Sequence, residues 1–121
     1  MGALMTEGME AVTARLQAGL VASQKISDLI SEFSLGEYEL ASWETKNTVE
    51  EEYQALAGSM QELRELDPDF AERIPGLAEA VGVGRHISGA ELEAEDEILW
   101  RSAAEELPQL QQALLQLLMH S

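Results

Sequence analysis

Apolar residues recur at intervals of three and four along most of the chain, which is the spacing of one face of an α-helix. The first such stripe predicts a helix from an N-cap at Thr6 to about Phe33. Its bulky members are Met9, Val12, Leu16, Leu20, Ile26, Ile30 and Phe33. The stripe loses its bulk at Gly19, Ala22 and Ser23, which favours a point of close helix approach over an open groove.

The middle of the chain changes its helical phase. A short helix over residues 37–46 would place Leu40 and Trp43 on one side, and a new apolar stripe follows it. That stripe consists of Val49, Tyr53, Leu56, Met60 and Leu63. Because the two patterns do not fall on one line, we predict a break near Asn47 in preference to one long bent helix.

Two helix-start signals mark the next region. Thr48 and Glu51 have the three-residue spacing of a capping box, which predicts a helix that begins there and ends near Leu66. Asp67 followed by Pro68 predicts the start of another helix, because proline lacks the N–H that the first helical turn leaves unpaired.

The segment after this start is expected to be helical but irregular. Its apolar residues at helical spacing are Phe70, Ile74, Leu77 and Val81. Pro75 must kink or divide the helix, because its ring clashes with the preceding turn. The two glycines within residues 82–86 break the pattern and predict a flexible loop.

The last helix is predicted to begin with a cap at Ser88. Its apolar arc comprises Leu92, Leu99, Trp100, Ala103, Leu107, Leu110, Leu114, Leu117 and Leu118. The arc stays in phase across Pro108, so we expect one helix kinked at this proline in preference to two helices. The chain is therefore predicted to be all-α, a small antiparallel bundle of four to six helices that forms a single domain over residues 1–121.

Charge is the most unusual global property of the chain. Its 23 acidic and 7 basic residues give a formal net charge of −16. Such a field repels DNA, RNA and anionic membranes, so we expect neither direct nucleic-acid binding nor membrane binding. The absence of cysteine excludes disulfides and fits a reducing compartment. The sequence also lacks a visible signal peptide and any membrane-length apolar run, so a cytoplasmic protein is expected.

No catalytic, cofactor-binding or metal-binding residue is predicted. The two histidines, His86 and His120, lack the glutamate three residues ahead that a di-iron helical bundle requires. Gly82 and Gly84 lack the remaining glycine and the lysine of a phosphate-binding loop. We therefore expect a protein that is not an enzyme and needs no cofactor.

An acidic ridge, defined as residues 91–97, is the first candidate surface. It places five carboxylates over two helical turns, and Asp96 falls on the same side as the apolar residues. One interpretation is an internal ion pair between Asp96 and Arg64 or Arg73, because an unpaired buried charge is unfavourable. The other is an open surface that meets a basic partner. On that interpretation its partner-binding residues are Glu93, Asp96 and Glu97.

Apolar residues off the core stripes form the second candidate surface. Residues 114–119 are apolar nearly all round, so this segment is either enclosed on two sides or forms an interface. Leu115 and Met119 extend the core stripe sideways, and together with Trp43 they are candidate partner-binding residues. A homodimer through this end of the chain is a further prediction.

Two classes of function remain. The favoured one is a non-catalytic acidic helical module, an adaptor, chaperone or inhibitor, that binds a basic or mixed apolar and basic protein surface. The alternative is a nucleic-acid-mimicking inhibitor of the phage type, whose carboxylates occupy a DNA- or RNA-binding groove of a host enzyme. Charge geometry discriminates them. A mimic needs carboxylates in rows on one continuous face, whereas an adaptor needs an apolar patch with a charged rim.

Overall fold

The computed structural model describes residues 2–89 and 92–119, with side chains described over residues 10–85 and 96–119. Within these ranges the backbone is helical almost throughout and contains no strand. The elements are α1 (Gly2–Ile30), α2 (Leu35–Glu39), α3 (Trp43–Leu66), α4 (Pro68–Glu72), α5 (Leu77–Gly89), α6 (Leu92–Arg101), the π-helical turn η1 (Ser102–Glu106) and α7 (Leu107–Met119). Because α6, η1 and α7 are continuous, the predicted small all-α bundle of four to six helices is confirmed.

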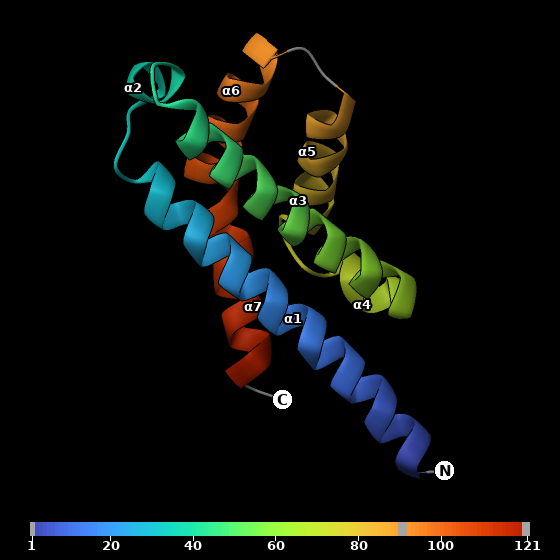
Figure 1. Ribbon diagram of the computed structural model, residues 1–121. Coiled ribbons are helices and arrows are strands. Elements are labelled where there is room, and N and C mark those ends of the chain that lie inside the picture. Colours follow the sequence, from blue (N-terminus) through green and yellow to red (C-terminus); the bar gives the residue numbers. More distant parts are fainter. Residues whose placement is uncertain (1, 90–91, 120–121) are drawn as a thin grey trace.

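The long helices pack around α3. Helices α1 and α3 run antiparallel and side by side, α5 flanks α3, and α7 packs against α1 (Figure 1). The amino-terminal end of α1 extends beyond the other helices (Figure 1). One hydrophobic core joins residues from all seven α-helices. The largest side chains fully buried in it are Tyr38, Tyr53, Ile26, Leu56, Met60, Leu63, Leu77, Leu99, Leu107, Leu110 and Leu114. Burial of each such side chain contributes about 1.5–3 kcal/mol.

The close approach predicted at Gly19 is confirmed. A Cβ atom at this position would lie 3.4 Å from Leu114 Cδ1 and would overlap the side chain of Met60. Ala22 and Ser23 are also buried, and the Ser23 hydroxyl donates to the Leu20 carbonyl oxygen at 2.8 Å. Small residues therefore let α1 lie close to both α3 and α7.

The first helix starts and ends earlier than predicted. The N-cap predicted at Thr6 is wrong, because α1 already begins at Gly2. Ala3, Leu4 and Met5 are strong helix formers, and they outweigh the preference of a threonine for a capping position. The helix ends at Ile30, before the predicted Phe33.

The break in the middle of the chain lies before the position that the phase change predicts. Helix α2 begins with a capping box, in which Ser34 Oγ accepts the Glu37 N–H at 3.3 Å and Glu37 Oε1 accepts the Ser34 N–H at 3.0 Å. Helix α3 then begins at Trp43, after Ser42 caps it by accepting the Thr45 N–H at 3.2 Å. The predicted helix over residues 37–46 is therefore divided.

The predicted break at Asn47 and cap at Thr48 are consequently wrong. The Thr48 hydroxyl donates to the Glu44 carbonyl oxygen at 2.9 Å inside α3, so its hydrogen bond is already satisfied within the helix. Asn47 also lies inside α3, and its side-chain amide donates to Glu51 Oε1 at 3.1 Å. The predicted end of this helix at Leu66 is confirmed.

The region around Pro75 follows the sequence more closely. Asp67 caps α4 by accepting the Phe70 N–H at 3.1 Å, and Pro68 occupies the first turn, as predicted. The predicted division at Pro75 is also confirmed, since α4 ends at Glu72 and α5 begins at Leu77. Gly76 connects them with a φ of +86°, a conformation that favours glycine.

The loop predicted over residues 82–86 and the cap predicted at Ser88 are wrong, because both lie inside α5. The reason is packing. A Cβ atom at Gly84 would overlap Ala57 Cβ of α3, so this glycine permits two helices to touch and does not interrupt one. A Cβ atom at Gly82 would meet no other atom within 4 Å, and the helix accommodates this glycine without a break.

The last helix is a single element with an irregularity at the predicted place. The π-helical turn η1 ends two residues before Pro108, and the Leu107 N–H donates to the Ser102 carbonyl oxygen five residues back. A regular α-helix would press the proline ring against the carbonyl group of Ala104. The wider turn relieves that clash and keeps α6 and α7 continuous. None of the described helices is long and apolar enough to cross a membrane.

Candidate protein-binding surfaces

Two large apolar side chains project from the junction of α2 and α3. Leu40 follows α2 as its C-cap and is 89% exposed, while Trp43 begins α3 and is 75% exposed. The serine caps at Ser34 and Ser42 fix the starts of α2 and α3, and so the backbone from which these two side chains project. We call this pair the Leu40–Trp43 patch.

Exposed acidic residues flank the Leu40–Trp43 patch in the sequence. Glu37 and Glu39 of α2 and Glu44 of α3 are exposed. Hydrogen bonds from the backbone and side chain of Ser34 lower the pKa of Glu37, so its carboxylate is ionised. Among the side chains that the structure describes, no basic group lies within ion-pair distance of Glu39 or Glu44. The patch therefore has an acidic rim, made of Glu37, Glu39 and Glu44.

Lys46 connects this patch with the acidic ridge. Its Nζ atom lies 3.0 Å from Asp96 Oδ2 of α6 and donates to the Glu39 carbonyl oxygen at 2.6 Å. The internal ion pair considered for Asp96 therefore forms, but its predicted partners Arg64 and Arg73 are wrong. This ion pair joins the amino-terminal part of α3 to α6, at the end of the bundle where α2 packs against α6 (Figure 1).

The rest of the acidic ridge is only partly described. Glu97 Oε1 lies 2.9 Å from Arg101 Nε, and Arg101 Nη1 lies 4.0 Å from Glu105 Oε1. These side chains are about half exposed, so their ion pairs are screened by solvent. Glu93 belongs to α6, but its side chain lies outside the described residues. Both ridge carboxylates that the structure describes, Asp96 and Glu97, have a basic partner within the chain.

Leu115 and Met119 lie on a second surface. Both are exposed on the outward side of α7, whereas Leu114 next to them is fully buried. The carboxyl-terminal end of α7 lies at the opposite end of the bundle from α2 (Figure 1). The structure therefore separates the predicted partner-binding residues into two surfaces and does not bring them into one site.

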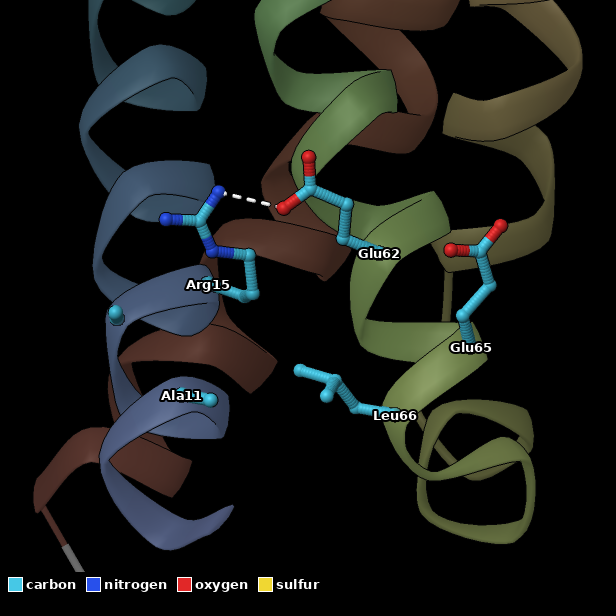
Figure 2. Close-up of a pocket in the computed structure, with 6 residues that line it drawn as sticks. Ala11, Arg15, Glu62, Glu65 and Leu66 are labelled. Atoms are coloured by element: carbon cyan, nitrogen blue, oxygen red, sulfur yellow. Dashed lines mark hydrogen bonds and ion pairs between the residues drawn. The ribbon is translucent and has the colours of Figure 1, made fainter. Parts of the chain in front are cut away.

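A shallow groove of about 400 Å³ lies between α1 and α3. Figure 2 shows Arg15 of α1 and Glu62 of α3 pointing toward each other across it, with 2.7 Å between Arg15 Nη1 and Glu62 Oε2. Ala11 and Leu66 line its open end. Sequence reasoning missed this groove because it depends on the pairing of two helices far apart in the chain. The ion pair spans the groove and neutralises Arg15 and Glu62, while Glu65 adds a second carboxylate to the lining.

A buried polar cluster lies at the π-helical turn. The hydroxyl groups of Tyr53 and Ser102 are hydrogen-bonded, and Ser102 Oγ donates to Glu106 Oε2 at 3.4 Å. Burial raises the pKa of Tyr53 to about 12. The cluster joins α3 to η1 inside the core, which is a structural arrangement. Among the described residues, no group of three His, Asp or Glu side chains could hold a metal ion.

A second tyrosine is buried without such a partner. Tyr38 of α2 is fully buried, and its hydroxyl group has no hydrogen-bond partner among the described atoms. Burial raises its pKa, and the charges of Asp96 and Glu50 raise it further. Its ring contacts Phe33 edge-on, with 6.3 Å between the ring centroids, so Tyr38 serves the core chiefly through its aromatic ring.

Comparisons with known proteins give no information on the function of this chain. No family model, no curated protein and no solved structure matches this chain.

Proposed function

We propose that the protein is a non-catalytic acidic helical module that binds another protein through the Leu40–Trp43 patch. The observation that carries the proposal is the exposure of these two large apolar side chains, 89% and 75%, within an acidic rim. Tryptophan is enriched among the residues that dominate binding energy at protein interfaces. An apolar centre with a charged rim is also the usual composition of such an interface.

The partner that fits this patch has an apolar pocket bordered by lysine or arginine. Burial of the exposed parts of Leu40 and Trp43 would contribute about 5 kcal/mol before the cost of association is subtracted. That gain alone gives weak binding, so attraction between basic partner residues and the acidic rim is needed for specificity. We expect this interaction to take place in the cytoplasm, where this protein would act on its partner as an adaptor, chaperone or inhibitor.

The ion pairs of the acidic ridge favour this proposal over the nucleic-acid mimic. A mimic presents rows of carboxylates that are free to replace phosphates. Asp96 and Glu97 already pair with Lys46 and Arg101, so a basic groove would have to displace these partners. The rim residues Glu39 and Glu44, in contrast, have no such competitor among the described side chains.

The experiment is quantitative affinity capture from a lysate of the source organism, with immobilised wild-type protein, Trp43→Ala and Leu66→Ala as baits. Leu66 is the matched control, because it is also an exposed apolar residue but lies at the far end of α3. We expect Trp43→Ala to lose basic proteins that wild type and Leu66→Ala both retain. Retention of the same proteins by Trp43→Ala would refute the proposal.

A second pair of variants separates the rim from the ridge. Charge reversal of Glu39 and Glu44 to lysine should abolish capture, because it replaces attraction by repulsion at the patch. Charge reversal of Glu93 and Glu97 to lysine should leave capture largely intact. If the ridge variant loses capture while Trp43→Ala keeps it, the ridge recognises the partner and the mimic alternative is favoured.

A further inference from the structure

We infer that the outward faces of α1 and α7 form an interface for a second copy of this chain. This inference goes beyond the proposed function, because it concerns different helices from those that carry the Leu40–Trp43 patch. The uncharged face, as we define it, consists of Gln17, Val21 and Gln24 of α1 and Gln112, Leu115 and Met119 of α7. All six side chains are exposed.

Helix α7 and the adjoining part of α1 are poor in charged residues. Helix α7 contains no charged residue, although 25% of the chain is charged and a segment of its length would on average hold about three. Residues 11–24 of α1 contain one, Arg15, and it is paired with Glu62 of α3. The two helices are in contact, since Leu114 of α7 packs at Gly19 of α1. Over residues 11–24 of α1 and along α7, no carboxylate interrupts the outward sides, and Glu10 and Asp28 lie beyond this stretch of α1.

The occupant that suits an uncharged face on this chain is a second copy of the chain. A second copy also carries a net charge of −16, so its approach is opposed wherever carboxylates face each other. Two packed helices span about 20 Å, given an axial separation of about 8–10 Å and a helix diameter of about 10 Å. The Debye length at physiological salt is about 8 Å, so carboxylates at the margins are screened from the centre of this face. A basic partner, in contrast, would gain nothing from a face without acidic groups.

The side chains of the uncharged face are self-complementary. A twofold interface brings the same patch of both copies together, so each group must suit its own equivalent. A glutamine amide meets this condition because it carries both hydrogen-bond donors and an acceptor, whereas a carboxylate repels its equivalent. Gln17, Val21 and Gln24 repeat at spacings of four and three, and Gln112, Leu115 and Met119 at three and four. Each helix thus presents one stripe with an apolar centre, as helix–helix packing requires.

The test is sedimentation equilibrium of the full chain over a wide concentration range. Leu115→Asp and Val21→Asp each place a carboxylate at the centre of the uncharged face. Leu66→Asp is the matched control, because Leu66 is 51% exposed and Leu115 is 46% exposed, but Leu66 belongs to α3. We expect wild type and Leu66→Asp to dimerise reversibly. Both variants of the uncharged face should weaken dimerisation about tenfold or more while retaining the wild-type helix content.

Salt provides an independent readout. Dimerisation should strengthen as salt rises, because screening weakens the repulsion between two negatively charged copies. Capture of a basic partner through the Leu40–Trp43 patch should weaken under the same conditions. Trp43→Ala should leave dimerisation unchanged, so failure of one proposal is distinguishable from failure of the other. A wild-type chain that stays monomeric at every concentration and salt level, or a dimer that is insensitive to both Leu115→Asp and Val21→Asp, overturns the inference.

Discussion

Lys46 of α3 forms an ion pair with Asp96 of α6, with 3.0 Å between Nζ and Oδ2. The same ammonium group donates to the Glu39 carbonyl oxygen, the backbone that leads from α2 into the Leu40–Trp43 patch. One side chain therefore connects α3 with α6 and with the end of α2, one helical turn after the exposed Trp43. Lys46 thus links the backbone at the end of α2 to a carboxylate of the acidic ridge.

The coupling between Lys46 and Asp96 should be measurable by a double-mutant cycle with Lys46→Met and Asp96→Asn. The two side chains are 25% and 18% exposed, so the pair lies between a surface pair and a buried one. We expect a coupling free energy of about 1 kcal/mol in urea unfolding. The control is the cycle for Lys25 and Glu52, 3.8 Å apart with a largely exposed lysine, where we expect almost none. Equal coupling in both cycles would contradict this prediction.

Alanine substitutions at the two glycines of α5 should have opposite effects on stability. Gly82→Ala should stabilise the protein by about 0.5–1 kcal/mol, because alanine favours the helix and no atom lies within 4 Å of the added methyl group. Gly84→Ala should destabilise it, because the methyl group would overlap Ala57 Cβ and force α5 away from α3. Thermal melts of the two variants check this. A stabilising Gly84→Ala would mean that the helices do not touch there.

The protein should lose stability at alkaline pH through its buried tyrosines. Burial raises the pKa of Tyr53 from 10.0 in an unfolded chain to about 12, and the pKa of Tyr38 is raised as well. Above pH 10 the unfolded chain therefore releases protons that the folded chain retains. The free energy of unfolding should be constant with respect to these groups below pH 10. Above it we expect a fall of ~1.4 kcal/mol per pH unit for each tyrosine, until the folded-state pKa is reached.

Urea unfolding of wild type and Tyr53→Phe across this pH range checks the assignment. Removal of the Tyr53 hydroxyl group should lessen the alkaline slope, because phenylalanine has no proton to release. Phenolate absorbance gives a second measure, since both tyrosines should ionise only as the helix signal disappears. Ionisation near pH 10 in a chain that remains helical would contradict the buried placement.

Two adjacent leucines of α7 should respond differently to the same substitution. Leu114 is fully buried, so Leu114→Asp places an unpaired charge in the core and should prevent cooperative folding. Leu115 is 46% exposed, so Leu115→Asp should keep the wild-type helix content with a loss of stability below about 1 kcal/mol. Circular dichroism melts decide between them. Equal effects of the two substitutions would mean that α7 turns a different face toward the core.

The sequence predicts best where the deciding interaction is local. Asp67 caps the helix that begins at Pro68, and Pro75 divides α4 from α5, because both effects act through the adjacent turn of backbone. The choice between Ser42 and Thr48 as a cap is different. Serine ranks above threonine at capping positions, but Glu51 gives Thr48 the spacing of a capping box, so the local signals conflict.

The failures arise where the deciding partner lies far along the chain. Gly84 reads as a helix breaker in the sequence, but Ala57 of another helix determines that it is a contact residue. The sequence suggests an arginine partner for Asp96, yet the packing of α2 against α6 brings Lys46 to it. The candidate surface shows the same limit. The apolar residues Trp43 and Leu115 could be singled out from the sequence, but their placement on separate surfaces requires the fold.

The ion pairs within the chain affect the rate at which a positively charged ligand encounters it. Arg15, Lys25, Lys46 and Arg101 all lie in ion pairs, so much of the positive charge of the chain is already neutralised by its own carboxylates. The remaining excess of negative charge acts beyond contact distance and can raise the rate of diffusional encounter by about 10–10³-fold at low ionic strength. On the proposed function, the net charge would govern how often a basic ligand arrives, and the burial of Trp43 on binding would govern how long the ligand stays bound.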